Sequence, residues 1–221
     1  MKILYLMHVD IKWIKQRPHF LAEEISKKNN LLVFYYFSYK RGNLCTPNNQ
    51  FNSYPYLLTP FFFKINFLRA LNSFLLKIFF KIVIVFFRPK YIWITSPFQY
   101  NFFFKKDKKI IIYDCMDYHR EFFESQIIRN EIDHLEKKIR YSVNKIICSS
   151  KNLSSRFNVK NTYIVNNAFS DKWRFKLDKK KLTKLHKKPS IDNVILCYFG
   201  TLSNHINYPL LQAITKKYKF I

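Results

Sequence analysis

The feature that most constrains the fold is an apolar run that ends in two carboxylates, within residues 110–118 (IIIYDCMDY). An apolar run of this length predicts a strand buried on both faces, which is typical of a parallel sheet flanked by helices. Asp114 and Asp117 close the run, and His119 follows directly. Ligands of open α/β sheets bind outside the carboxyl ends of the strands, so the sequence predicts a site at this edge.

Short apolar segments alternate with longer segments of helical period along the whole chain. Further strands are predicted at residues 2–7, 31–37, 91–95, 145–148, 162–165 and 194–199, and helices at 17–28, 61–87, 100–104, 127–141, 152–157 and 208–217. Residues 39–60 contain Gly42 and three prolines, which predicts a long loop. The alternation predicts an α/β fold with a Rossmann-like parallel sheet.

A change in composition divides the chain. Residues 1–175 are predicted to form one domain, and residues 176–192 are almost wholly basic and polar, which is typical of a linker. Residues 193–221 are expected to begin a second Rossmann-like domain. One strand and one helix cannot bury both faces of a sheet, so this second domain is expected to be incomplete.

The chain of 221 residues carries a formal net charge of +25 and contains only two glycines. The charge favours anionic partners such as nucleic acid, anionic lipid or phosphorylated substrates. Coding bias in an AT-rich genome accounts for the same composition. Neither glycine-rich phosphate-binding motif is present. The apolar run at the N-terminus is too short for a signal peptide.

Residues 61–87 are the most hydrophobic part of the chain and also contain four cations. Lys64, Arg69, Lys77 and Lys81 interrupt the run, so a membrane span is not expected. A helix packed in the core fits this pattern. Its phenylalanines exceed what one buried stripe uses, so our preferred hypothesis is a helix that also contacts an anionic membrane surface.

Four cysteines lie far apart in the sequence without a C-x-x-C pair, at Cys45, Cys115, Cys148 and Cys197. This spacing predicts reduced thiols in a cytoplasmic protein. No Cys/His array predicts a metal site. The polar residues that converge on one sheet edge are His8, Asp10, Asp114, Asp117 and His119. Each aspartate alone is more often a helix cap or a loop former than a catalyst, whereas together they indicate a cleft.

Five segments resemble, in order, segments of the bacterial family-4-type glycosyltransferases with the GT-B fold. They are residues 16–24 (QRPHFLAEE), 113–117 (YDCMD), 145–153 (KIICSSKNL), 166–169 (NNAF) and 198–202 (YFGTL). The resemblance implies two facing Rossmann-like domains, the first for an acceptor and the second for a nucleotide-sugar. It also implies retaining hexosyl transfer without a metal or other cofactor.

The acceptors implied by the resemblance are lipid-linked glycans or polysaccharides of the cell surface, elongated at the inner face of the membrane. The chain is accordingly expected to be cytoplasmic and peripherally attached to the membrane through residues 61–87. Acceptor binding is implied for Asp10, Arg17, Asp114, Asp117, Ser150 and Asn166, and donor binding for Gly200 and Thr201. The catalytic residue stays unassigned, with Asp114, Asp117 and His119 as candidates.

Two departures from the family pattern affect the expected activity. Asn167 and Phe169 replace a glycine and an aspartate, and the family's paired-glutamate motif is absent. Transfer by this chain alone is therefore not expected. The alternative is a non-enzymatic basic protein that binds anionic membrane or nucleic acid. Nucleic acid is disfavoured, because the aromatic residues fall in apolar runs rather than in alternating exposed positions.

Overall fold

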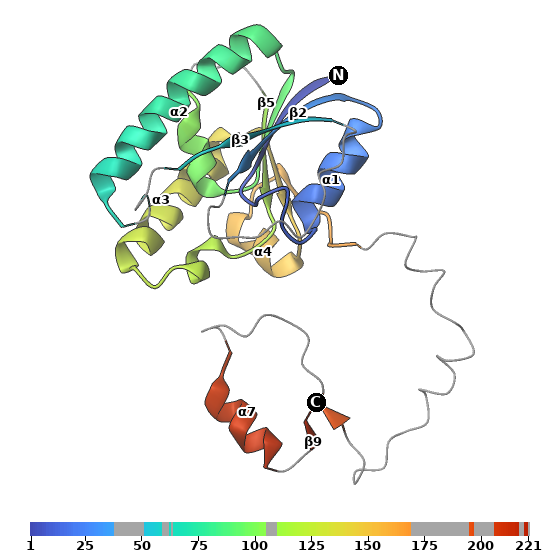
Figure 1. The fold of residues 1–221 in the computed structure, drawn as a ribbon, viewed down its shortest axis with the longest axis vertical. Helices are drawn as coiled ribbons and strands as arrows, with labels where there is room; N and C mark the ends of the chain where they lie inside the picture. The colour runs from blue at the N-terminus through green and yellow to red at the C-terminus, as the bar shows by residue number, and fades with distance from the viewer. Residues whose placement is uncertain are drawn as a thin grey trace, which may run out of the picture. The chain divides into compact units, whose positions relative to one another are not determined.

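The computed structural model describes residues 1–37, 51–58, 62, 64–104, 110–168, 195–196, 206–216 and 219–220. The chain forms two compact units, Met1–Ala168 and Phe169–Ile221. The first unit contains a parallel sheet flanked by helices (Figure 1). This confirms the predicted α/β, Rossmann-like class.

All neighbouring strands of the seven-stranded sheet are parallel, in the order β3-β2-β1-β4-β5-β6-β7. The strands are β1 (Lys2–Met7), β2 (Asn30–Tyr36), β3 (Asn52–Tyr56), β4 (Tyr91–Ile94), β5 (Ile110–Cys115), β6 (Lys145–Cys148) and β7 (Thr162–Ile164). The chain builds outward from β1 to β3 and then returns to place β4 on the other side of β1. The two directions diverge between β1 and β4, which is the topological switch point of the sheet.

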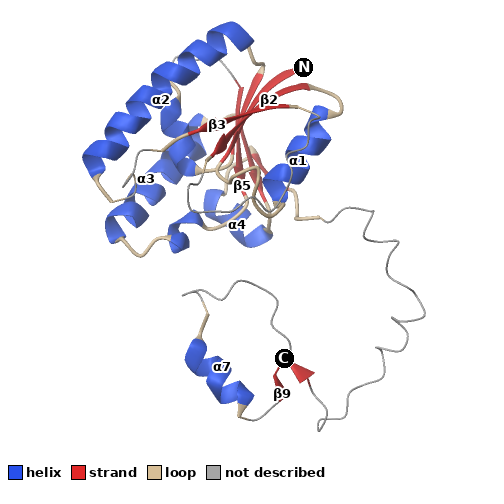
Figure 2. Cartoon of the chain, in the orientation of Figure 1, coloured by secondary structure: helices blue, strands red, loops and turns tan. Residues whose placement is uncertain are grey.

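Helices cover both faces of the sheet (Figure 2). They are α1 (Arg17–Ser26), α2 (Asn66–Phe87), α3 (Gln126–Ser142) and α4 (Lys151–Phe157), with two 3₁₀ turns, η1 (Pro97–Phe102) and η2 (His119–Phe122). Alternate residues of β1 pack against the helices on opposite faces of the sheet. Leu4 and Leu6 pack with α2, α3 and α4 on one face, whereas Tyr5 and Met7 pack with α1 on the other.

Strand β3 corrects the expectation of a loop over residues 39–60, of which 39–50 and 59–60 lie outside the described residues. Its sequence, NSYPY, contains a proline that argues against a central strand. The strand forms because β3 lies at the edge of the sheet, where Pro55 need not donate to an outer neighbour. Tyr56 anchors it in the core.

Helix α2 is buried along one stripe only. Arg69, Asn72, Leu76, Phe80 and Ile84 face the rest of the unit. Nine other large apolar side chains of α2 are 40–81% exposed: Phe67, Leu71, Phe74, Leu75, Ile78, Phe79, Ile82, Val85 and Phe86. At 100° per residue, the exposed set centres opposite the buried stripe, so α2 carries apolar side chains on both sides.

By length and composition alone, α2 is apolar enough to cross a membrane. Its buried stripe packs against the rest of the unit. Phe80 stacks on Phe102 of η1, with ring centroids 5.9 Å apart. Arg69, which is 7% exposed at the side chain, pairs with Glu131 of α3 at 2.6 Å. The expectation that this helix does not span a membrane is consistent with these contacts.

The described part of the second unit contains β8 (Ile195–Leu196), α7 (Tyr208–Thr215) and β9 (Lys219–Phe220). The two strands pair in parallel. Strand β8 and helix α7 fall within the segments predicted from the sequence. The linker predicted over residues 176–192 lies outside the described residues.

Candidate functional site at the carboxyl edge of the sheet

The loop between β1 and α1 is closed by side chains of the QRPH segment. The backbone N–H of Gln16 donates to Nδ1 of His19 at 3.1 Å. The other ring nitrogen of His19 then carries the proton and donates to the carbonyl of Asp10 at 3.3 Å. Pro18 lies in the first turn of α1, where its missing N–H is not needed. These contacts fix the start of α1 at the sheet edge.

Arg17 and Asp114 form a buried ion pair across that edge. Nε of Arg17 donates to both carboxylate oxygens of Asp114 at 3.1 and 3.2 Å, and Nη2 donates to Oδ1 at 3.0 Å. The side chains are 6% and 0% exposed. Burial raises the pKa of Asp114, whereas the hydrogen bonds and charge of Arg17 act to lower it.

The remaining guanidinium nitrogen of Arg17 holds the segment that follows β7. Nη1 donates to the carbonyls of Val165 and Asn166 at 2.6 and 3.3 Å, and to Oδ1 of Asn167 at 3.3 Å. Arg17 therefore connects the start of α1, the end of β5 and the exit of β7. Whether Arg17 and Asp114 also touch an acceptor stays a prediction.

Two histidines meet at the switch point, where β1 and β4 end. Oγ1 of Thr95 accepts from the backbone N–H of His8 and donates to the carbonyl of Leu6, both at 3.0 Å. That use of the hydroxyl proton makes Nδ1 of His8 the donor in its 2.7 Å contact with Oγ1. Nε2 is then the basic nitrogen of the His8 ring.

His119 lies against His8, with ring centroids 5.1 Å apart in an edge-to-face arrangement. Its Nε2 donates to the carbonyl of Thr95 at 3.1 Å. Burial lowers the pKa of His119 to about 4. His119 is therefore neutral at physiological pH, and because its one N–H is donated to Thr95, its Nδ1 can accept a hydrogen bond but supplies neither a proton nor a positive charge.

Asp117 differs from the other candidates. Within the part of the chain that the structure describes, its half-buried carboxylate makes no hydrogen bond or ion pair. Burial raises its pKa. A carboxylate without a counter-charge at the end of a central strand suits an acceptor hydroxyl or a transferred proton. Of the three catalytic candidates, Asp117 is the one whose side chain is not already engaged.

The other predicted site residues have local structural partners or lie outside the described residues. The carboxylate of Asp10 accepts from the N–H of Lys12 at 2.9 Å, as a loop former does. Oγ of Ser150 accepts from the N–H of Leu153 at 3.3 Å, which confirms the predicted cap of α4. Asn166 is exposed. Gly200 and Thr201 lie outside the described residues.

The sequence did not lead us to the buried side-chain amide of Gln99, which lies behind the switch point. Oε1 of Gln99 accepts from the N–H groups of Thr95 and Ser96 at 2.8 and 3.0 Å. Its Nε2 donates to the hydroxyl of Tyr56 at 2.9 Å. This network fixes Thr95, whose hydroxyl binds His8 and whose carbonyl binds His119. The S-x-x-Q spacing from Ser96 to Gln99, a capping-box pattern, is the signal that indicates it.

Cys115 and Cys148 are buried free thiols in register on β5 and β6, which confirms the prediction for this pair. Cys45 and Cys197 lie outside the described residues. Within the described segments, no group of three or more His, Cys, Asp or Glu side chains is arranged to hold a metal ion. That transfer needs no metal or cofactor stays a prediction.

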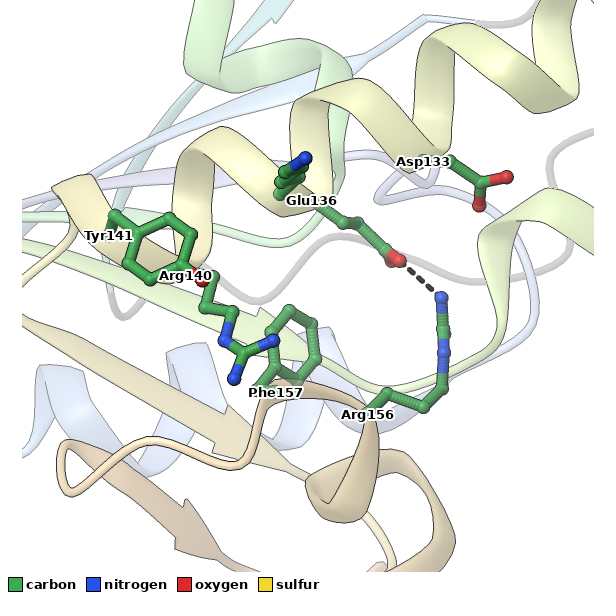
Figure 3. A pocket seen from close by; sticks show the side chains of 7 residues that line it. Asp133, Glu136, Arg140, Tyr141, Arg156 and Phe157 are labelled. Carbon is green, nitrogen blue, oxygen red and sulfur yellow. Dashed lines mark hydrogen bonds and ion pairs between the residues drawn. The ribbon is translucent and has the colours of Figure 1, made fainter.

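A polar pocket of about 210 Å³ lies between α3 and α4 (Figure 3). Its carboxylates are already engaged by arginines. Arg156 of α4 pairs with Glu136 of α3, and Arg120 pairs with Asp133 at 2.6 Å. Arg156 also lies over the ring of Tyr118, 3.6 Å from its centroid. The Arg156–Glu136 pair ties α4 to α3, and the Arg120–Asp133 pair ties η2 to α3.

Comparison with protein-family models and with curated proteins gives no match. Solved structures match in fold. Sucrose-phosphate synthase from Thermosynechococcus elongatus superposes with a TM-score of 0.68 at 10% identity, over 99% of this chain and 60% of that one. The fold is that of the GT-B enzymes.

Two further matches have the same fold. UGT89C1 of Arabidopsis thaliana, in complex with UDP-L-rhamnose, gives a TM-score of 0.52 at 14% identity, over 99% of this chain and 64% of that one. UDP-GlcNAc 2-epimerase from Methanocaldococcus jannaschii gives 0.52 at 13% identity, over 98% and 61%. The chain thus spans about three fifths of the length of these structures.

Replacing Arg17 by Met tests the buried pair. The change leaves Asp114 buried without its counter-charge, so the free energy of unfolding in urea should fall by about 3–5 kcal/mol. Adding Asp114→Asn should recover a large part of that loss. Lys15→Met, which breaks the exposed pair between Lys15 and Glu23, is the matched control and should cost less than about 1 kcal/mol. Equal losses for Lys15→Met and Arg17→Met would contradict this account.

The lowered pKa of His119 predicts acid sensitivity. Because the folded state favours the neutral ring, its contribution to stability is complete above the unfolded pKa of 6.5 and is lost as the pH falls toward about 4. The loss over this window should be about 3 kcal/mol. His119→Gln should remove that part of the slope of unfolding free energy against pH. His134→Gln, at an exposed position of α3, should leave the slope unchanged.

Proposed function

We propose that this chain is the acceptor-binding half of a glycosyltransferase that elongates lipid-linked or polysaccharide acceptors of the cell surface. The observation that carries the proposal is the GT-B-like sheet with Asp117 at the carboxyl end of β5, where no described residue pairs with its carboxylate. Open α/β sheets bind their ligands at this place. The narrower family assignment is supported by the five segments that resemble family-4-type enzymes, which occur in the same order in this chain.

A nucleotide-sugar is the proposed donor. UGT89C1, which has the same fold, is known in complexes with UDP and with UDP-L-rhamnose. In the proposed arrangement the donor belongs to the second Rossmann-like domain, through Gly200 and Thr201. The first unit supplies the acceptor side, where Asp117, Ser150 and Asn166 follow β5, β6 and β7. The hexose is transferred with retention and without a bound metal.

The proposed location is the inner face of the cell membrane, with α2 as the contact surface. Its exposed apolar side chains run along a helix of about 33 Å. Residues 25–106, which contain α2, carry twelve Lys and Arg and no Asp or Glu. Lys77 and Lys81 of α2 border the apolar side chains on one flank. Each Lys or Arg near an anionic surface adds about 1 kcal/mol of attraction.

A glycolipid-binding experiment tests the proposed acceptor role. Vesicles of phosphatidylglycerol and phosphatidylcholine are prepared with and without polyprenyl-diphosphate-linked N-acetylglucosamine, matched in total charge. The chain should bind the glycolipid vesicles at least fivefold more tightly in sedimentation. Asp117→Asn should reduce that gain, because it removes the charge but not the shape of the side chain, and should leave binding to plain vesicles unchanged.

Two outcomes of this experiment would count against the proposal. One is equal binding to both vesicle types by the unaltered chain. The other is displacement of the chain from glycolipid vesicles by single-stranded DNA at matched phosphate concentration, with the glycolipid preference lost. That second result would favour a basic nucleic-acid-binding protein instead. Glu24→Gln, an exposed carboxylate of α1, serves as the charge-matched control for Asp117→Asn.

A further inference from the structure

An apolar groove of about 540 Å³ lies beside the C-terminal half of α2, on the edge of the sheet. It is lined by Leu32, Phe34, Tyr54, Pro55, Phe79, Ile82, Val83, Phe86 and Phe87. No side chain in this lining is charged. The volume falls within the range of about 300–1,000 Å³ that small-ligand sites occupy.

The walls of the groove come from three elements. Strand β2 and the edge strand β3 supply one wall, and α2 supplies the other. Phe79 packs edge-to-face against Phe34, with ring centroids 5.5 Å apart, so the floor is fixed by core contacts. At the mouth, Tyr54 is 50% exposed and Phe86 is 81% exposed. A rigid floor with an open apolar mouth suits a flexible hydrocarbon chain better than a polar metabolite.

Cations surround the C-terminal end of the groove. Nζ of Lys2 lies 5.6 Å from the centroid of the Phe87 ring. Arg88 and Lys90 follow α2 directly, and no acidic residue occurs between residues 25 and 106. A second copy of a chain with a net charge of +25 is a poor occupant of such a surface, because like charges repel. Charge complementarity selects an anionic lipid.

We propose that the groove between β2, β3 and α2 binds one hydrocarbon chain of an anionic membrane lipid, with the phosphate near Lys2, Arg88 and Lys90. This inference rests on the membrane contact that we propose for α2, and it adds a binding site for one lipid chain. The exposed side chains of α2 would lie in the membrane surface, while the groove takes a single chain out of the bilayer. An acyl chain and an isoprenoid chain share the required chemistry.

The test uses lyso-phosphatidylglycerol with a photoactivatable diazirine in its single acyl chain, at a concentration below micelle formation. After irradiation, label should be found in the peptides that contain Tyr54 and residues 79–87. Val83→Phe, which fills the groove, and Tyr54→Asp, which places a charge at its mouth, should each reduce labelling at least tenfold. Ile78→Phe, on α2 but outside the groove lining, should label as the unaltered chain does.

Competition distinguishes an isoprenoid chain from an acyl chain as the occupant of the groove. Excess unlabelled polyprenyl phosphate that suppresses labelling identifies an isoprenoid site, and excess lyso-phosphatidylglycerol that alone suppresses it identifies an acyl site. Label spread evenly over α2, or unchanged labelling of both groove variants, would overturn the proposal. Thermal unfolding of each variant, expected within a few degrees of the unaltered chain, shows that lost labelling is not lost folding.

Vesicle sedimentation of the same variants separates this proposal from the one on which it rests. If the groove proposal alone is wrong, the chain binds anionic vesicles but its groove peptides carry no label. If the membrane contact is wrong, the chain fails to sediment with vesicles, while labelling by the monomeric lipid in the groove still reports a chain-binding site.

Discussion

The ion pair between Arg17 and Asp114 is the interaction on which the carboxyl edge depends. A guanidinium with almost no exposed surface satisfies a carboxylate with none and, with its last nitrogen, the carbonyls that follow β7. Leaving either charge alone in this setting costs several kcal/mol. The pair therefore fixes three distant segments together, and it decides which carboxylate of the YDCMD segment stays accessible. Asp114 is engaged in holding the edge, whereas no described residue pairs with the carboxylate of Asp117, which is why we propose it as the ligand-binding carboxylate.

Helix α2 is apolar both on its buried stripe and on its exposed side, and the exposed side is the most unusual surface of the chain. One stripe, centred on Leu76, Phe80 and Ile84, closes the core over the sheet. The other side is nearly as apolar and is exposed, which soluble monomers rarely allow over so large a surface. The stretch of sequence around it, residues 25–106, contains twelve Lys and Arg and no Asp or Glu. The proposed membrane contact uses the exposed side of α2, and packing on the sheet uses the buried stripe, so the two roles are compatible.

Local and periodic signals predicted much of the fold, because apolar runs and turn residues determine the central strands directly. Strand β3 was missed because edge strands tolerate Pro55 and polar residues, and only pairing with β2 creates it. The site was predicted as a set of residues but not as a geometry. The QRPH segment was expected at the carboxyl edge, where the structure places it, yet the partners of Arg17 lie 97 and 148 residues away. Contacts at such separation, and the contact between Gln99 and Tyr56, follow from strand order, which the sequence does not reveal.

Electron paramagnetic resonance on anionic vesicles tests most directly whether the molecule meets a membrane through α2. Nitroxide labels are placed at Phe74→Cys and Ile82→Cys on α2 and at Glu24→Cys on α1, with Cys45 and Cys197 replaced by Ser. The account predicts that both α2 labels become accessible to oxygen and protected from a water-soluble nickel chelate, while the α1 label stays accessible to nickel. Nickel accessibility at all three positions, or protection at the α1 label instead, would contradict it.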